Sequence, residues 1–219
     1  MIFRTLYADE LRGFARSKVM VALWLGLPLL AIILKLLRPD TEGVPLLTFV
    51  AVMIGSIGGT LSSVLLSTMI TGERIRHVYD LFLVRPVPRT LLLLSKYLAA
   101  LTCLVAAAGV SLGVAYVVDL VTQTSVPGIG RDLAESLLVS VAGMAIASAV
   151  GVLFGVLINS IAVSAILSVY LGNQLSAVIV LPTVFMEDVN VPLIASLVGV
   201  LVPLVLLAVA ALMFNRKSL

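Results

Sequence analysis

The longest run of charged side chains in this sequence lies between Gly72 and Lys96. It contains two carboxylates, five basic side chains and the only histidine, His77. A lone histidine cannot supply a paired-histidine zinc site, and no intramembrane serine–histidine pair can be assembled around it. We therefore predict no catalytic and no metal-binding residue, and we interpret this run as a surface that contacts another molecule.

The other motifs that would indicate chemistry are missing. Cys103 is the only cysteine, so it cannot form a disulfide within the chain. The sequence has no Gly-x-x-x-x-Gly-Lys-Ser/Thr motif, so we do not expect it to bind ATP itself. The basic residues are scattered, and we expect no nucleic-acid partner. We predict no cofactor on this chain.

Composition indicates what kind of protein positions these residues. Hydrophobic residues make up 61% of the 219 residues and charged residues 11%, and the mean hydropathy is +1.23. These values are typical of a multi-pass membrane protein. We expect one membrane domain over residues 1–219, without a separate soluble catalytic domain.

Six apolar segments are long enough to cross a bilayer as helices, since a span needs about 20 residues. Their leucine and valine runs do not alternate with polar residues, so the predicted fold class is an all-α membrane protein with six transmembrane helices. The predicted spans are Met20–Leu37, Pro45–Thr71, Thr90–Val118, Leu133–Ile158, Ser160–Leu181 and Val191–Phe214.

The distribution of charge predicts the orientation of these spans. Eleven Lys and Arg residues lie on the side of both termini and of the central connection, and three lie on the other side. Seven acidic residues lie on that other side and four on the first. By the positive-inside rule, both termini and residues 72–89 are expected in the cytoplasm.

Residues 1–19 carry a helical pattern of their own. Apolar residues recur every three or four positions, and charged residues occupy the other faces, which predicts an amphipathic helix along the membrane interface. We expect its apolar face in lipid and its basic residues at the headgroups. The helix either anchors the first span or contacts a partner subunit. The apolar set is Phe3, Leu6, Tyr7, Leu11 and Phe14.

Small residues repeat every four positions in three of the spans. Such ladders allow close helix packing, either within the chain or between subunits. The ladders are Gly55, Gly59, Ser63 and Ser67; Gly143, Ala147, Gly151 and Gly155; and Ser164, Ser168, Gly172 and Ser176.

The predicted spans contain no Asp, Glu, Lys, Arg or His near their middle, unlike many ion-coupled carriers. The most polar feature at mid-span is the pair Asn173 and Gln174, close to Tyr170. These three residues are candidates for a substrate path, and hydrogen bonding between helices is the alternative.

The charged run resembles a segment of the ABC transporter type-2 family of permeases, where it connects the second and third spans. In that family a Glu closes the second span, a short helix ends in a Pro-Val-x-Arg turn, and a Lys follows. The N-terminal residues 9–18, followed by an apolar span with Leu27-Pro28, are also similar to this family's entrance helix. The matching positions in the connection are Glu73, Pro86, Val87, Arg89 and Lys96.

Two features depart from the family pattern. The family often has Gly-Thr where this chain has Arg76-His77-Val78, so the start of the coupling helix is expected to differ. Only Pro182–Asn190 remains for the half-inserted helices that the family places between its last two spans. That hairpin is expected to be abbreviated or absorbed into the ends of the spans.

The resemblance implies a cytoplasmic coupling helix, over Arg74–Val84, that docks on a separate ATPase. Prolines at 86 and 88 would set its exit angle, because neither can continue a helix. Tyr79 and Phe82 are the expected docking side chains; an ordinary amphipathic interfacial loop is the alternative.

The predicted function is therefore the membrane subunit of a prokaryotic ABC transporter in the inner or plasma membrane. Two copies would act with two copies of an ATPase that carries ATP and Mg²⁺, and membrane lipid would surround them. An exporter of an amphiphilic or hydrophobic substrate is favoured. A permease like the haem exporter of cytochrome c maturation, or a small ATP-independent carrier or structural subunit, stays open.

Overall fold

The computed structural model describes residues 2–37, 46–76, 88–121, 129–185 and 191–216. Within these ranges the chain is helical and contains no strand. The seven helices are α1 (Ile2–Ala15), α2 (Lys18–Leu37), α3 (Leu46–Ile75), α4 (Arg89–Val121), α5 (Ile129–Leu157), α6 (Ile161–Phe185) and α7 (Val191–Arg216).

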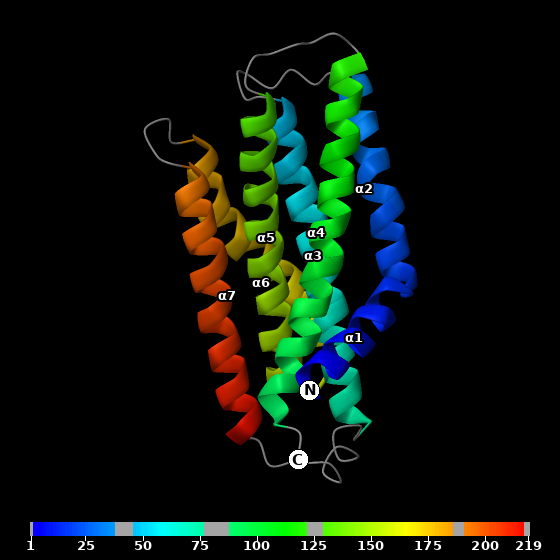
Figure 1. Ribbon diagram of the computed structural model, residues 1–219. Helices are drawn as coiled ribbons and strands as arrows, with labels where there is room; N and C mark the ends of the chain where they lie inside the picture. Colours follow the sequence, from blue (N-terminus) through cyan, green and yellow to red (C-terminus); the bar gives the residue numbers. More distant parts are fainter. Residues whose placement is uncertain (1, 38–45, 77–87, 122–128, 186–190, 217–219) are drawn as a thin grey trace.

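The long helices lie side by side in a bundle, with α7 at one edge and α2 at the other (Figure 1). Five of them, α3 to α7, are long and apolar enough to cross a membrane. The pair α1 and α2 is bent by 63° at its break and would add a sixth span if the two helices form one. These features are those of a multi-pass membrane protein, and each of the six predicted spans corresponds to one helix from α2 to α7.

The N-terminal helix α1 is amphipathic as predicted. Phe14 is buried and Leu6, Tyr7 and Leu11 pack against the main hydrophobic core, whereas the charged side of the helix is exposed. The prediction that this apolar face lies in lipid is wrong, because the face packs against α4 in the bundle. The Oγ of Ser17 accepts a hydrogen bond from the Met20 amide at 3.1 Å and so caps the start of α2.

The core of the bundle is the pair α3 and α5, whose two ladders of small residues face each other. A Cβ added to Gly151 would lie 2.5 Å from the carbonyl oxygen of Ser63, and one added to Gly59 would lie 3.1 Å from the Cβ of Ala147. Backbones can come this close only where side chains are missing or small. The ladders of α3 and α5 therefore pack within one chain.

The ladder of α6 also faces inward. Ser164 and Ser168 are fully buried, and the Oγ of Ser176 donates a hydrogen bond to the carbonyl of Gly143 on α5 at 3.2 Å. The opposite side of α6 and most of α7 are exposed. In the span segments, 72% of α5 lies buried within the chain, against 22% for α6 and 17% for α7. The outer surfaces of α6 and α7 are thus available to lipid or to another protein.

The connections at the helix ends lie partly outside the described residues. Helix α3 continues through Glu73 and Arg74 to Ile75, so the first residues assigned to the coupling helix form the last turn of α3. Residues 77–87, which carry the rest of that prediction, are outside the described part. Helix α6 runs through Pro182 to Phe185, so the first four residues of the predicted connection to α7 belong to α6, and residues 186–190 are outside the described part.

Candidate functional site

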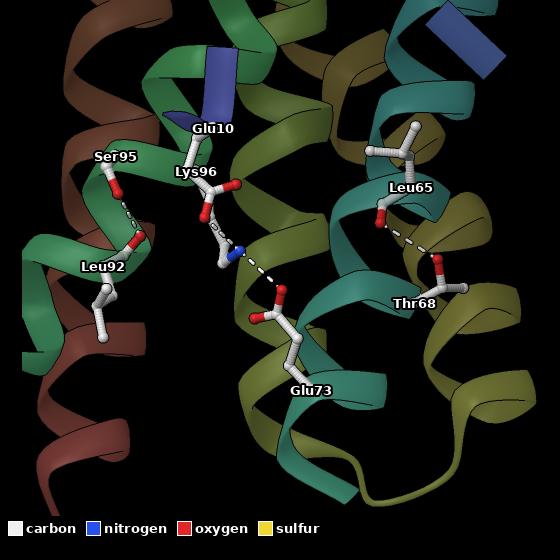
Figure 2. A network of polar contacts seen from close by, with 7 residues as sticks. All are labelled: Glu10, Leu65, Thr68, Glu73, Leu92, Ser95 and Lys96. Atoms are coloured by element: carbon white, nitrogen blue, oxygen red, sulfur yellow. Dashed lines mark hydrogen bonds and ion pairs between the residues drawn. The ribbon is translucent and has the colours of Figure 1, made fainter. Parts of the chain in front are cut away.

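A lysine and two glutamates from three helices meet at the end of the bundle where α3 finishes and α4 begins. The Nζ of Lys96 lies 2.6 Å from the Oε1 of Glu10 and 2.8 Å from the Oε1 of Glu73. Figure 2 shows the ammonium group of Lys96 between the two carboxylates. The cluster joins α1, α3 and α4 through one cation.

Local helix geometry explains how these side chains meet. Glu10 lies four residues after Leu6 and four before Phe14, so it projects from the apolar face of α1 toward α4. Lys96 lies in the second turn of α4, next to the buried Ser95 and Tyr97. Glu73 lies in the last turn of α3, at the same end of the bundle as the start of α4.

The cluster is largely removed from solvent. The side chain of Lys96 is 5% exposed, and those of Glu10 and Glu73 are 18% and 22% exposed. Desolvating an ammonium group is costly, and charge-assisted hydrogen bonds to both carboxylates offset that cost. Loss of either glutamate would leave more of the desolvation cost of Lys96 without compensation, and so would destabilise the fold.

The neighbouring residue on α3, Arg74, binds a different part of the bundle. Its Nη1 donates to the carbonyls of Gly155 at 3.2 Å and Val156, and its Nη2 donates to the Oδ1 of Asn159 at 2.8 Å. These carbonyls belong to the last turn of α5, where helix carbonyls lack partners in the helix and the helix dipole favours a cation. Arg74 therefore caps α5.

A threonine one turn earlier on α3 strengthens the same junction. The Oγ1 of Thr71 lies 3.2 Å from the carbonyl of Gly155 and 3.1 Å from the Oγ of Ser164 on α6. Thr71, Glu73 and Arg74 together connect the end of α3 to α4, α5 and α6, and Lys96 extends the connection to α1. We call these three residues the α3 junction; it lies directly before residues 77–87.

The structure unites two of the residues proposed for ATPase coupling, Glu73 and Lys96. Arg89 is the first residue of α4, and its side chain is outside the described part of the chain. The other proposed coupling residues, Tyr79, Phe82, Pro86 and Val87, also lie outside the described residues.

Sequence reasoning missed Glu10 and Arg74 as partners in this site. For Glu10 a signal existed, because a carboxylate in the middle of an otherwise apolar helix face requires a polar partner in the bundle. For Arg74 no comparable signal exists in the sequence, because its partners are mostly backbone carbonyls on α5, about eighty residues later.

The residues proposed for a substrate path lie on the exposed side of α6. Asn173 lines a cavity of about 200 Å³ between α3, α5 and α6, and its Oδ1 accepts a hydrogen bond from Ser56 at 3.2 Å. Both proposed roles of Asn173, a place on a substrate path and hydrogen bonding between helices, are therefore compatible with its position. Tyr170 and Gln174 are exposed and are not among the residues that line this cavity.

Comparison with known proteins does not assign this chain to a family. A scan against protein-family models and a search of curated proteins give no match to the sequence. Among the described residues, no group of three or more His, Cys, Asp or Glu side chains is arranged to hold a metal ion.

Proposed function

We propose that this chain is the membrane subunit of an ATP-driven transporter of the ABC type-2 permease kind, with ATP hydrolysis on a separate partner chain. The observation that carries the proposal is the α3 junction. The segment proposed to dock on an ATPase follows this junction directly. The junction binds α4, α5 and α6, and it reaches α1 through Lys96.

The junction suits the transmission of force. A displacement of residues 77–87 would reach α1 and α4 through Glu73 and Lys96, and α5 and α6 through Arg74 and Thr71. The contacts between α3 and α5 are backbone-close, so these two helices would move as one body. In this proposal, the coupling helix begins after the last turn of α3, and Tyr79 and Phe82 dock on the ATPase.

The outer face of α6 supports a second copy of the chain. Tyr170, Asn173 and Gln174 are exposed near the middle of a helix that is long and apolar enough to span a membrane. The Oδ1 of Asn173 already accepts a hydrogen bond from Ser56, but the phenol of Tyr170 and the amide of Gln174 facing hydrocarbon would lack hydrogen-bond partners, which is unfavourable. Contact with a second copy, or a path between two copies, would satisfy them.

The charge distribution supports a topology in which both termini and residues 72–89 face the cytoplasm of a prokaryotic cell. In a Cys103→Ala background, a cysteine at Asp188 should react with an impermeant thiol reagent added outside the cell, and a cysteine at Arg12 should not. The reverse pattern would invert the proposed orientation.

The apolar bundle favours an amphiphilic or hydrophobic cargo and export over import. Within the described spans, no Asp, Glu, Lys, Arg or His lies near the middle to bind a small ion, and the polar groups near the proposed path are serine hydroxyls, amides and the phenol of Tyr170. An amphiphile needs few hydrogen-bonding groups for its head and a broad apolar lining for its tail.

The proposal is tested by copurification with the ABC ATPases encoded beside the gene for this chain. A stable complex is expected, and Phe82→Ala should weaken it without lowering membrane insertion. Val205→Phe, on the exposed face of α7, serves as the control and should leave the complex intact. Failure of every such ATPase to bind would leave an ATP-independent carrier or structural subunit as the better interpretation.

A further inference from the structure

An apolar groove runs between α4 and α7 on the outside of the bundle. Its volume is about 420 Å³, and apolar side chains supply nearly all of its lining. The groove exists because α7 packs mainly on α5 and only lightly on α4. The lining includes Leu93, Tyr97 and Leu101 from α4, and Gly199, Pro203 and Ala208 from α7.

The groove follows the helices for a substantial distance. On α4 it extends from Thr90 to Leu101, which corresponds to about 16 Å along a helix axis. At its inner end α7 approaches α5 closely, because a Cβ added to Gly199 would lie 2.8 Å from the Cβ of Ala142. A volume of about 420 Å³ spread over about 16 Å leaves a cross-section much smaller than that of a helix, so the groove is long and narrow, and it begins where α4 begins.

The groove offers contact surface with almost no hydrogen-bonding groups, and Thr90 at its end is the polar residue of its lining besides Tyr97. The hydroxyl of Tyr97 donates a hydrogen bond to the carbonyl of Ala145 on α5 at 3.2 Å. Tyr97 therefore lines the groove with its aromatic ring and not with its hydroxyl. Leu94 is 40% exposed and Leu204 59% exposed along the opening. An occupant with a flexible apolar chain matches this lining, and a charged or strongly hydrated one does not.

The Thr90 end of the groove is the end of the bundle at which two helices carry a terminal basic residue. Helix α4 begins at Arg89 and α7 ends at Arg216, and these two helix ends lie at the same end of the bundle (Figure 1). Basic residues at the ends of transmembrane helices attract anionic headgroups at the bilayer surface. We propose that the groove binds one acyl chain of an anionic phospholipid, with the lipid phosphate at the level of Arg89 and Arg216.

A second copy of the chain fits this groove less well than an acyl chain does. A helix with its side chains is about 10 Å wide, whereas the groove is a narrow slot between two helices of one chain. The polar exposed residues that call for a protein partner lie on α6, not beside the groove. The lipid site is thus separate from the proposed contact between copies, and it does not depend on the proposed transport function.

The experiment is native mass spectrometry of the delipidated, detergent-solubilised chain with dioleoylphosphatidylglycerol or dioleoylphosphatidylcholine added. Phosphatidylglycerol is expected to be retained on the unaltered chain. Ala208→Phe fills the groove and should lower retention about tenfold, because contact with only a few methylene groups accounts for that factor. Val205→Phe, on the exposed face of α7 and outside the groove, should leave retention unchanged.

Two further variants keep the test decisive. Ala211→Leu also fills the groove with a smaller side chain, and it replaces Ala208→Phe if that variant does not fold. The double variant Arg89→Gln and Arg216→Gln should remove the preference for phosphatidylglycerol over phosphatidylcholine.

Several results would overturn the proposal. If Ala208→Phe and Val205→Phe retain phosphatidylglycerol equally, the retained lipid is ordinary lipid around the bundle and not a molecule bound in the groove. Equal retention of the two lipids by the unaltered chain would remove the anionic headgroup from the proposal. A disulfide between two copies through Ala208→Cys, in a Cys103→Ala background, would assign the groove to a protein interface.

Discussion

The Nζ of Lys96 lies 2.6 Å from the Oε1 of Glu10, although the two residues are 86 positions apart in the sequence. This contact holds the amphipathic helix α1 against the start of α4. It also places a carboxylate on the apolar face of α1, where only a buried cation can balance it. The N-terminal helix is consequently part of the bundle.

Replacing Lys96 by Met should destabilise the chain by about 3 kcal/mol, because both carboxylates would stay partly buried without their cation. Thermal unfolding in detergent measures this change, with a thiol-reactive dye reporting exposure of the buried Cys103. Lys18→Met is the control, since Lys18 is exposed. Equal stability of the two variants would contradict a structural role for the cluster.

Gly151→Ala should destabilise the packing of α3 against α5 by about 1–3 kcal/mol. The added Cβ would meet the backbone of Ser63, which cannot move aside without shifting α3. Gly113→Ala is the matched control on α4, where an added Cβ has no neighbour within 4 Å and alanine favours the helix. The same dye assay should show a lower unfolding temperature only for the first variant.

Arg74→Gln should remove the charged cap of α5 and lower stability by about 1.5–3 kcal/mol, the range for hydrogen bonds to a charged group. The neighbouring Arg76 is exposed, so Arg76→Gln should change stability little. Hydrogen exchange of the backbone amides in the last turn of α5 and in residues 158–160 should increase in the Arg74 variant. Unchanged exchange there would mean that Arg74 does not hold this junction.

Gln174→Cys, in a Cys103→Ala background, should cross-link two copies of the chain in membranes treated with a short bifunctional thiol reagent. The physical reason is that the polar mid-span face of α6 is proposed to meet a second copy. Leu212→Cys on the exposed face of α7 is the control and should give monomers. Gel mobility separates the products, and cross-linking by the α7 variant alone would move the interface to α7.

The sequence predicted the helices well because charge and apolar length define where a membrane span can begin and end. It also predicted the three ladders of small residues. It could not say which ladders face each other, since that depends on the three-dimensional order of the helices. The contact between Gly151 and Ser63 shows that the ladders of α3 and α5 are used for packing within the chain.

The site was only partly predictable. Glu73 and Lys96 were selected together through a family resemblance, and they lie in contact. Glu10 completes the cluster only because α1 folds back at a 63° bend onto α4, and the amphipathic pattern by itself was interpreted as a lipid-facing surface. Packing of α1 against protein in place of lipid is a tertiary effect that periodicity does not encode.

Glu73 and Arg74 are joined by a single peptide unit, yet they bind opposite groups of helices. Because consecutive residues on a helix point about 100° apart, one side chain reaches α4 while the next reaches α5. A rotation of the last turn of α3 must therefore move both contacts together, with one shortening as the other lengthens. Helices α4 and α5 are thus both bound to the last turn of α3. While both contacts are intact, neither helix can change its position relative to α3 without affecting the other.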